Sequence, residues 1–204
     1  MSLYFNHIPS FIQRVYHHRK WRVDTNKKKL YITFDDGPHP TLTTEILDLL
    51  SKFHAKVTFF QLGSKVDAYP ALHKRCKEDG HTIGNHGYYH LDALKIYHSR
   101  FFQNISRGQK VTGSKLFRPA FGRLPIFRKK KIHRANNVVM WDIMPGDFDK
   151  NISYNKCIEI IKKNVQNGSI IVLHENDKAA DKVIYILKWI LEYYSDRGFK
   201  FSSL

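Results

Sequence analysis

The chain of 204 residues has few cysteines, no long apolar run and no Gly/Ser/Pro-rich linker. Two cysteines, Cys76 and Cys157, are too few for a disulfide framework, so we expect free thiols. No stretch approaches the roughly 20 apolar residues of a membrane span. The apolar residues of positions 1–22 are interrupted by polar ones and precede the charges, the reverse of a secretory signal. We therefore expect one domain, in the cytoplasm or peripheral to the inner membrane.

Acidic residues are also scarce, since 18 Asp and Glu face 34 Lys and Arg and the net charge is +16. The cations concentrate at residues 17–22, 26–29 and 127–134. Such clusters attract nucleic acid, an anionic membrane or an acidic glycan, but a plain solvated surface has the same composition. None of them has the pattern of a nucleic-acid-binding motif, so we expect no nucleic-acid partner. Peripheral association with an anionic membrane or envelope surface stays open.

Residues 1–28 are predicted to be an extension that precedes a domain at 29–204. Its apolar residues favour a short amphipathic helix from Ser10, a plausible N-cap, to about His18. This helix can dock on the domain or lie at a membrane surface, and docking is the preferred interpretation.

Within the domain, short β-rich runs alternate with stretches of helical periodicity. The predicted strands lie at 29–34, 56–62, 81–85, 115–118, 137–143, 169–174 and 199–203. Helical spacing is found between them, at 43–53, 66–80, 158–168 and 183–198. This alternation predicts an α/β domain with a mainly parallel sheet of about seven strands.

Polar side chains that could take part in catalysis or metal binding follow four of these strands. They are Asp35 and Asp36, the Asn85–His86 pair, Arg118 and His174. In a closed parallel barrel the carboxyl ends of all strands meet at one mouth, where active sites are built. A barrel would therefore bring these four groups together.

Two histidines are spaced as metal ligands. His86 and His90 are four residues apart, which places both imidazoles on one face of a helical turn. In a chain with 12 histidines such a pair is often incidental. One of the carboxylates at 35 and 36 can supply the third ligand of a catalytic site. Together they predict a metal site.

The remaining carboxylate is suited to act as a base, because a nearby cation such as Arg118 would keep it ionised. His174 ends a very apolar strand and is either a core residue or a residue of the mouth. Strand alternation places Val172 on its face and Leu173 on the other. Asp147 can hydrogen-bond the imidazole and favour its protonated form, as an acid catalyst needs.

These residues fall within five ordered motifs that resemble those of the polysaccharide deacetylases, which are also known as carbohydrate esterase family four or the NodB-homology domain. The motifs are TFDDGPHP (33–40), GNHGYYH (84–90), FRPAFG (117–122), WDIMPGDF (141–148) and IVLHE (171–175). The resemblance implies a single distorted, TIM-like (β/α) barrel. It also implies one divalent metal, usually zinc (Co, Ni or Mn being alternatives), and hydrolysis of N-acetyl, sometimes O-acetyl, groups on a glycan.

Carried over motif by motif, the resemblance makes Asp35 the general base and Asp36, His86 and His90 the metal ligands. Arg118 would hold the base.

The same resemblance makes His174 the general acid, tuned by Asp147. The backbone N–H of Phe121 would stabilise the oxyanion. Trp141 and Val172 would shape the acetyl pocket, and Leu173 is grouped with them as a substrate-binding residue.

Some positions depart from the family pattern. Gly87 stands where Ser or Thr is usual, and Ala120 and Phe121 stand where Pro and Tyr are usual. In the fourth motif, Met144 and Gly146 replace common Asp and Arg residues and Phe148 replaces Trp. These departures bear on substrate specificity, while the metal and acid–base residues are intact.

The first hypothesis is therefore a monomeric, metal-dependent deacetylase acting on an acetylated glycan or glycoconjugate. The alternative is a catalytically weak protein with the deacetylase fold that binds anionic glycan or nucleic acid through its basic surface. Two histidines and one aspartate also occur in iron oxygenases. Those proteins usually present His-x-Asp before a distant His, whereas here the aspartate comes first.

Overall fold

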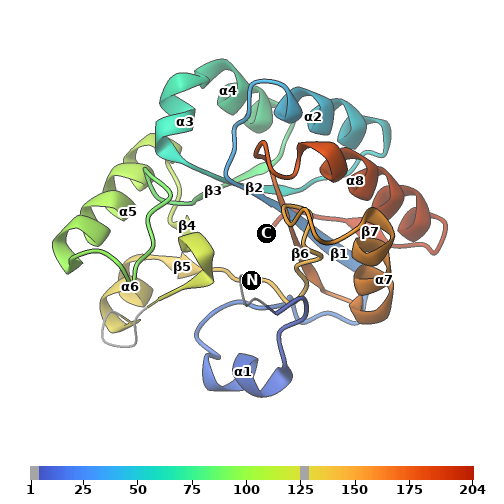
Figure 1. Ribbon diagram of the computed structural model, residues 1–204, viewed down its shortest axis with the longest axis horizontal. Helices are drawn as coiled ribbons and strands as arrows, with labels where there is room; N and C mark the ends of the chain where they lie inside the picture. Colours follow the sequence, from blue (N-terminus) through green and yellow to red (C-terminus); the bar gives the residue numbers. More distant parts are fainter. Residues whose placement is uncertain (1–4, 125–128) are drawn as a thin grey trace.

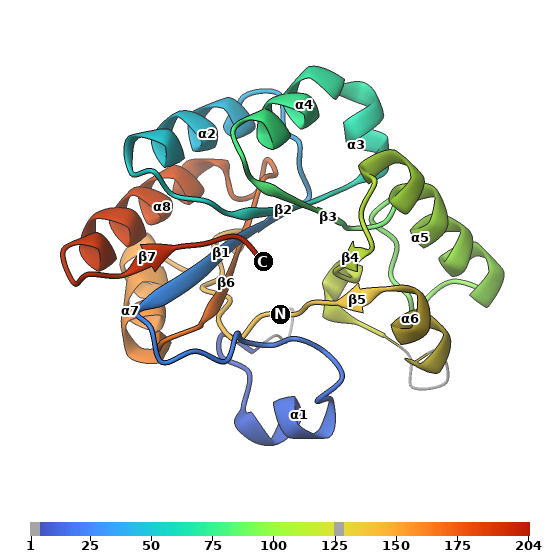
Figure 2. The same cartoon turned by 180° about the vertical axis from the view of Figure 1, so that it is seen from behind.

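The computed structural model describes residues 5–124 and 129–204, except the side chains of 129–131. Seven parallel strands form one sheet in the order β5-β4-β3-β2-β1-β6, with β7 paired to β1. The sheet curls into a half-barrel with helices around its outside (Figures 1 and 2). This confirms the predicted (β/α) barrel with about seven parallel strands.

The strands are β1 (Lys29–Asp35), β2 (Thr58–Gln61), β3 (Thr82–Asn85), β4 (Leu116–Phe117), β5 (Asn137–Val138), β6 (Ile170–His174) and β7 (Lys200–Phe201). The helices are α1 (Ser10–Val15), α2 (Leu42–Lys52), α3 (Gly63–Ala68), α4 (Pro70–Glu78), α5 (His98–Thr112), α6 (Lys129–Ala135), α7 (Tyr154–Asn164) and α8 (Ala180–Ser195), with a 3₁₀ turn η1 (Ala120–Gly122).

Strand β1 is the centre of the sheet. It pairs with β6 from Tyr31 to Asp35, while β7 and β2 share its opposite edge. Its side chains alternate: Ile32 and Phe34 pack outward, whereas Thr33 and Asp35 lie on the inner face with Arg118. One strand therefore contributes to both the outer core and the site.

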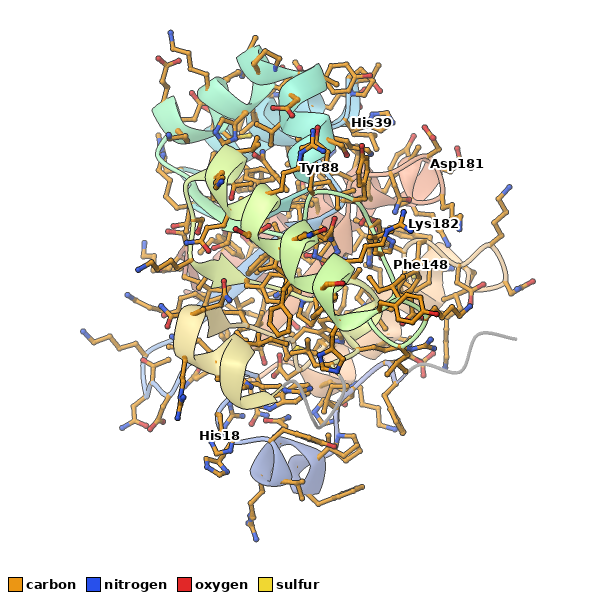
Figure 3. The ribbon with its side chains drawn as sticks, turned by 90° about the vertical axis from the view of Figure 1, so that its left-hand side faces the viewer. His18, His39, Tyr88, Phe148, Asp181 and Lys182 are labelled. Carbon is orange, nitrogen blue, oxygen red and sulfur yellow. The ribbon has the colours of Figure 1, made fainter. Side chains whose placement is uncertain are left out.

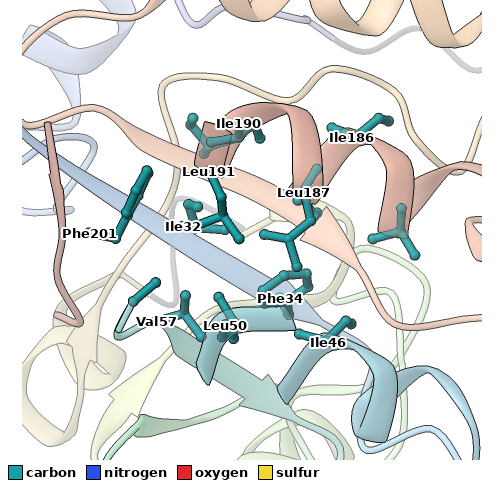
Figure 4. Packing of buried hydrophobic residues seen from close by; sticks show 14 of the residues in the cluster. Ile32, Phe34, Ile46, Leu50, Val57, Ile186, Leu187, Ile190, Leu191 and Phe201 are labelled. Carbon is teal, nitrogen blue, oxygen red and sulfur yellow. The ribbon is translucent and has the colours of Figure 1, made fainter. Parts of the chain in front are cut away.

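This alternation divides the apolar core in two. The outer cluster fills the space between the sheet and helices α2, α7 and α8, where Phe34, Leu187 and Leu191 are fully buried (Figure 4). The inner cluster lies on the other face and includes Phe60, Trp141 and Val172. Each fully buried large apolar side chain contributes about 1.5–3 kcal/mol, so the two clusters together hold the curved sheet in place.

The N-terminal extension lies between β5 and β6. The Lys20 N–H donates to Val138 O (2.9 Å) and its carbonyl accepts from the Met140 N–H (2.7 Å). Val23 N–H donates to Gly168 O at 2.9 Å, just before β6. Ile8 and Trp21 are buried in the inner cluster. The extension therefore bridges the open seam of the half-barrel.

Several elements differ from their predictions. Helix α1 ends at Val15, and Ser10 is its first residue; Pro9 takes the N-cap position and makes no side-chain cap. The predicted helix at 66–80 is two helices, because Pro70 starts α4. Helices α5 and α6 were not predicted, and β4, β5 and β7 are shorter than the predicted strands. The basic cluster at 127–134 lies partly outside the described residues.

Two further sequence expectations can be compared with the structure. Cys76 and Cys157 are free and buried, as predicted. Among residues 5–124 and 129–204, no helix is both long and apolar enough to cross a bilayer.

Asp142 links the seam to β6 and gives a test of the fold. Its Oδ1 accepts from the Ile170 N–H at 2.8 Å and its Oδ2 from the Ser169 hydroxyl at 2.9 Å. Burial raises the pKa of this carboxyl to about 7 from 3.8. Its protonated form is therefore favoured in the folded state, and its contribution to stability is lost as pH rises towards 7.

We expect Asp142→Asn, which keeps an acceptor for Ile170, to stabilise the protein above pH 7 by on the order of 1 kcal/mol. At about pH 4, where the folded carboxyl is already neutral, the gain should disappear. Denaturant unfolding across pH measures this, with the exposed Asp24→Asn as control. A wild-type pH dependence in Asp142→Asn would contradict the assignment.

Candidate active site

The strand ends bring the predicted groups to one mouth, as expected. Asp35 at the end of β1 and His174 at the end of β6 are direct register partners. On the other side, Asn85 at the end of β3 is the partner of Phe117 at the end of β4, so His86 and Arg118 follow adjacent strands.

Asp35 and Arg118 form a buried ion pair. The Arg118 guanidinium donates from Nη1 to Asp35 Oδ1 at 2.7 Å, and neither side chain is more than 5% exposed. The same nitrogen reaches the Thr33 hydroxyl (2.7 Å), and Nη2 donates to Met140 O (2.7 Å). The ring of Phe60 lies 4.1 Å from the guanidinium carbon. These contacts fix one oxygen of Asp35 and leave Oδ2 facing His86, at 3.9 Å from its Nε2.

Asp36 faces the two histidines instead. Its backbone has φ +75°, so the chain turns at the strand end and the two adjacent carboxylates point in different directions. Its Oδ1 lies 3.5 Å from His86 Nε2 and 3.4 Å from His90 Nε2. Although burial alone would raise the pKa of Asp36, the surrounding histidines outweigh it and hold that pKa below its usual value.

The donor set fits a divalent metal. Asp36 Oδ1 is buried and accepts no hydrogen bond from any residue that the structure describes. The three ligand atoms of Asp36, His86 and His90 lie within 4.8 Å of one another. Ligands about 2.1 Å from a tetrahedral zinc lie about 3.4 Å apart, which is close to the observed spacing. Partial burial, with His86, lowers the pKa of His90 to about 4, so that imidazole is neutral, as a ligand must be.

Two contacts outside the triad orient its ligands. The Nδ1 of His86 is 2.8 Å from the carbonyl oxygen of Arg118, so this nitrogen carries the proton and Nε2 keeps its lone pair for a metal. The Asn176 amide donates to Asp36 Oδ2 at 2.7 Å, which aims Oδ1 at the histidines. The sequence reasoning missed Asn176, although its position two residues after His174 was a usable signal.

His174 and Asp147 are paired opposite the triad. His174 Nδ1 is 2.9 Å from Asp147 Oδ1, and the His174 backbone N–H donates to Asp147 Oδ2 at 2.6 Å. Burial would lower the pKa of His174, but the Asp147 carboxylate outweighs it and raises that pKa to about 9. The imidazole is therefore protonated at neutral pH. The ring of Phe148 lies edge-on to it, with 4.7 Å between centroids.

The structure brings together some of the predicted substrate residues but not all of them. Trp141 and Val172 are both buried in the inner cluster, on the His174 face of β6. Phe121 has φ +58° and lies against His90, with ring centroids 4.4 Å apart. Leu173 is fully buried in the outer cluster. Its side chain therefore lies on the face away from the mouth, and grouping it with the substrate-binding side chains was wrong.

The loop that carries the metal histidines is held by Asn104 of α5. Gly87 has φ +90°, and a Cβ there would collide with the Asn104 amide. Asn104 Oδ1 accepts from the Tyr89 N–H (2.8 Å) and its Nδ2 donates to Tyr89 O (2.9 Å). Asn104, which the sequence reasoning missed, braces the loop at the point where a hydroxyl residue is usual.

Glu175 packs against the turn that follows β1. The sequence reasoning also missed this residue. It is fully buried, its Oε1 accepts from the Thr43 hydroxyl (2.6 Å), and its backbone N–H donates to Asp35 O (2.8 Å). Gly37 is required at the turn, because any side chain there would collide with the Glu175 carboxyl. Burial raises the pKa of Glu175 to about 7.

A carboxylate held by arginine, a protonated histidine and three candidate metal ligands lie together at the barrel mouth, an arrangement suited to hydrolysis. The polysaccharide deacetylase family model matches residues 22–140. The Bacillus cereus peptidoglycan-N-acetylglucosamine deacetylase is 33% identical over 192 residues, which is 90% of each chain. The Azorhizobium caulinodans chitooligosaccharide deacetylase is 30% identical over 202 residues, 90% of this chain and 96% of the relative. The chain belongs to the polysaccharide deacetylase family.

Solved structures agree with this fold. The Bc1960 peptidoglycan N-acetylglucosamine deacetylase in complex with 4-naphthalen-1-yl-N-oxidanyl-benzamide superposes with a TM-score of 0.88 at 26% identity, covering 97% of this chain and 95% of that one. A CE4 family pseudoenzyme from Bacillus anthracis also shares the fold, with a TM-score of 0.78 at 19% identity over 90% of this chain and 66% of that one. The fold alone therefore does not establish activity.

The Asn176 contact predicts an effect on metal binding. Asn176→Ala removes the donor that orients Asp36, so we expect metal affinity to fall about 10–100-fold. Competition titration of the apoprotein with zinc and a chromophoric chelator measures the dissociation constant. Asn151→Ala, in an exposed loop, is the control. Affinity within a factor of two of the wild type would show that Asn176 only caps the start of α8.

Proposed function

We propose that this protein is a metal-dependent hydrolase that removes the acetyl group from N-acetylglucosamine-type units of a glycan. One observation carries the proposal: the Asp35–Arg118 pair, the Asp36–His86–His90 cluster and the His174–Asp147 pair share one barrel mouth. The relatives named as peptidoglycan and chitooligosaccharide deacetylases support this substrate class.

Asp36, His86 and His90 would hold the metal, for which zinc is our first choice. When bound, a divalent metal polarises the acetyl carbonyl and lowers the pKa of a water molecule towards about 7.

Asp35 is the proposed base. Its Oδ1 is held by Arg118, so Oδ2 is the oxygen that takes a proton from the water as it attacks the acetyl carbon. The arginine holds the carboxylate in a buried ion pair before the step. Because the pair is buried, the orientation of the carboxylate is set before substrate enters.

His174 is the proposed acid. It is protonated before the step, and it donates that proton to the amide nitrogen as the C–N bond breaks. Acetate and a free amine on the sugar are the products. The backbone N–H of Phe121, in η1, would donate to the oxyanion, and Trp141 and Val172 would receive the acetyl methyl group.

The alternative is a catalytically weak member of the family that binds an anionic glycan or nucleic acid through basic residues. A pseudoenzyme with this fold is known, so the fold is compatible with that alternative. The base contacts one of the candidate metal ligands, and the acid, paired with Asp147, stands at the register position opposite the base, which favours catalysis.

The proposal predicts release of acetate from N-acetylated chitooligosaccharide or peptidoglycan fragments by the metal-loaded protein. Asp35→Asn should lower the rate about 10²–10⁴-fold and keep the metal. Asp36→Ala should lose metal and activity together. Acetate assays and metal analysis on the same preparations separate the two roles. No turnover of any acetylated glycan by the metal-loaded wild type, or equal metal loss in both variants, would overturn the assignment.

The His174–Asp147 pair predicts a pH effect. Activity should fall as pH rises through the pKa of His174, about 9, because the acid loses its proton. Asp147→Asn removes the largest influence that raises this pKa and leaves burial opposed only by Asp36 and Asp35, so the alkaline limb of kcat should move down by about one pH unit. Asp181→Asn, on the exposed start of α8, is the control. An unmoved alkaline limb would exclude His174 as the acid.

A further inference from the structure

Helix α1 has two apolar faces, and only one of them packs on the protein. Ile8, just before the helix, is buried in the inner cluster, and Ile12 and Tyr16 pack against it. Phe11 and Val15, one turn apart on another face, are 66% and 62% exposed. Docking therefore accounts for one face of α1 and leaves the other without a structural role.

The segment around α1 exposes one further large apolar side chain, and all its charged residues are positive. Phe5, which precedes the helix, is 54% exposed. Arg14 lies between Phe11 and Val15 on the surface, and Lys20 is also exposed. No aspartate or glutamate occurs from residue 5 to residue 23. An apolar face bordered by cations alone is the composition of an interfacial membrane-binding segment.

The helix next to His18 is also basic in sequence. His18 lies beside His133 of α6, with ring centroids 5.8 Å apart. The sequence of α6, Lys129–Ala135, contains four lysines and arginines and no acid. Figure 3 shows His18 next to α1 and away from Phe148, which contacts the acid histidine. This surface is therefore separate from the catalytic mouth.

The position of α1 leaves this face accessible. In Figures 1 and 2, α1 projects from the seam of the half-barrel, and no other helix of the described residues lies over its outer side. The extension is held at both ends of the projection, because Ile8 N–H donates to Asp142 O (3.0 Å) and Lys20 N–H to Val138 O (2.9 Å). The face is thus presented on a fixed support.

We propose that Phe5, Phe11, Arg14, Val15 and Lys20 form a peripheral docking surface for an anionic lipid membrane. The aromatic and aliphatic side chains would insert at the boundary of headgroups and acyl chains, while the cations pair with anionic headgroups. An acidic glycan would use the cations but would leave Phe11 and Val15 in water. The apolar face therefore favours lipid, and this inference does not depend on the proposed activity.

Vesicle flotation tests the proposal with the full chain. Wild-type protein should bind phosphatidylcholine vesicles that contain phosphatidylglycerol, bind pure phosphatidylcholine much more weakly, and dissociate partly as salt is raised. Phe11→Ser/Val15→Ser should lose about ten-fold or more of the affinity for the anionic vesicles. Tyr185→Ser is the matched control, because Tyr185 is also 66% exposed but lies on α8. It should bind as the wild type does.

A second pair of variants separates lipid docking from general polyanion binding. Arg14→Glu/Lys20→Glu should weaken vesicle binding as well, and thermal unfolding should confirm that all variants are folded. Wild-type affinity of the double serine variant, with loss only in the double glutamate variant, would identify a site for polyanions and overturn the proposal. So would failure of the wild type to float with anionic vesicles.

Discussion

The buried contacts of Arg118 link the strands of the barrel to the proposed catalytic base and to one candidate metal ligand. A buried guanidinium costs several kcal/mol unless its N–H groups are paired. Here they reach Asp35, Thr33 and the carbonyl groups of residues 139 and 140. The arginine thus joins β1 to the end of β4 and to the segment after β5. Its backbone carbonyl, at the same time, orients His86. One residue therefore sets the direction of both the base and a metal ligand, and neither can move without disturbing the other.

Two adjacent carboxylates at the end of a buried strand become chemically different through this arrangement. Asp35 continues the β1 direction and meets a permanent cation. Asp36 is turned by its positive φ towards two imidazoles and an amide donor. The repulsion expected between neighbouring carboxylates is offset on one side by Arg118, and a bound metal would offset it on the other. This turn is held by Thr43, Glu175 and Asn176. The fold itself therefore gives Asp35 and Asp36 different surroundings.

Much of this was predictable from the sequence because strand ends of a parallel barrel share one edge. The alternation of β-rich and helical runs fixed the fold class, and the residues at positions 35, 36, 86, 118 and 174 followed from their places after strands. Helix α5 was missed although its buried residues Phe101, Ile105 and Gly108 recur at helical spacing. Asn104 could not be assigned, because an asparagine in a helix is ordinary until its partners are known, whereas Asn176 was missed although it lies two residues after His174. Leu173 was misplaced although alternation already pointed it outward.

The bridge across the seam has a consequence for how the chain reaches this structure. Arg22 pairs with Ser169, and Lys20 with Val139, so segments from opposite ends of the sequence meet there. The extension is synthesised before its partners, which emerge from the ribosome more than a hundred residues later. Contacts of such high sequence separation form late and slowly. Residues 5–23 therefore cannot complete these contacts until β6 has been synthesised. Until then Ile8 and Trp21 stay exposed to solvent. Closure of the barrel is a final step of folding rather than a local one.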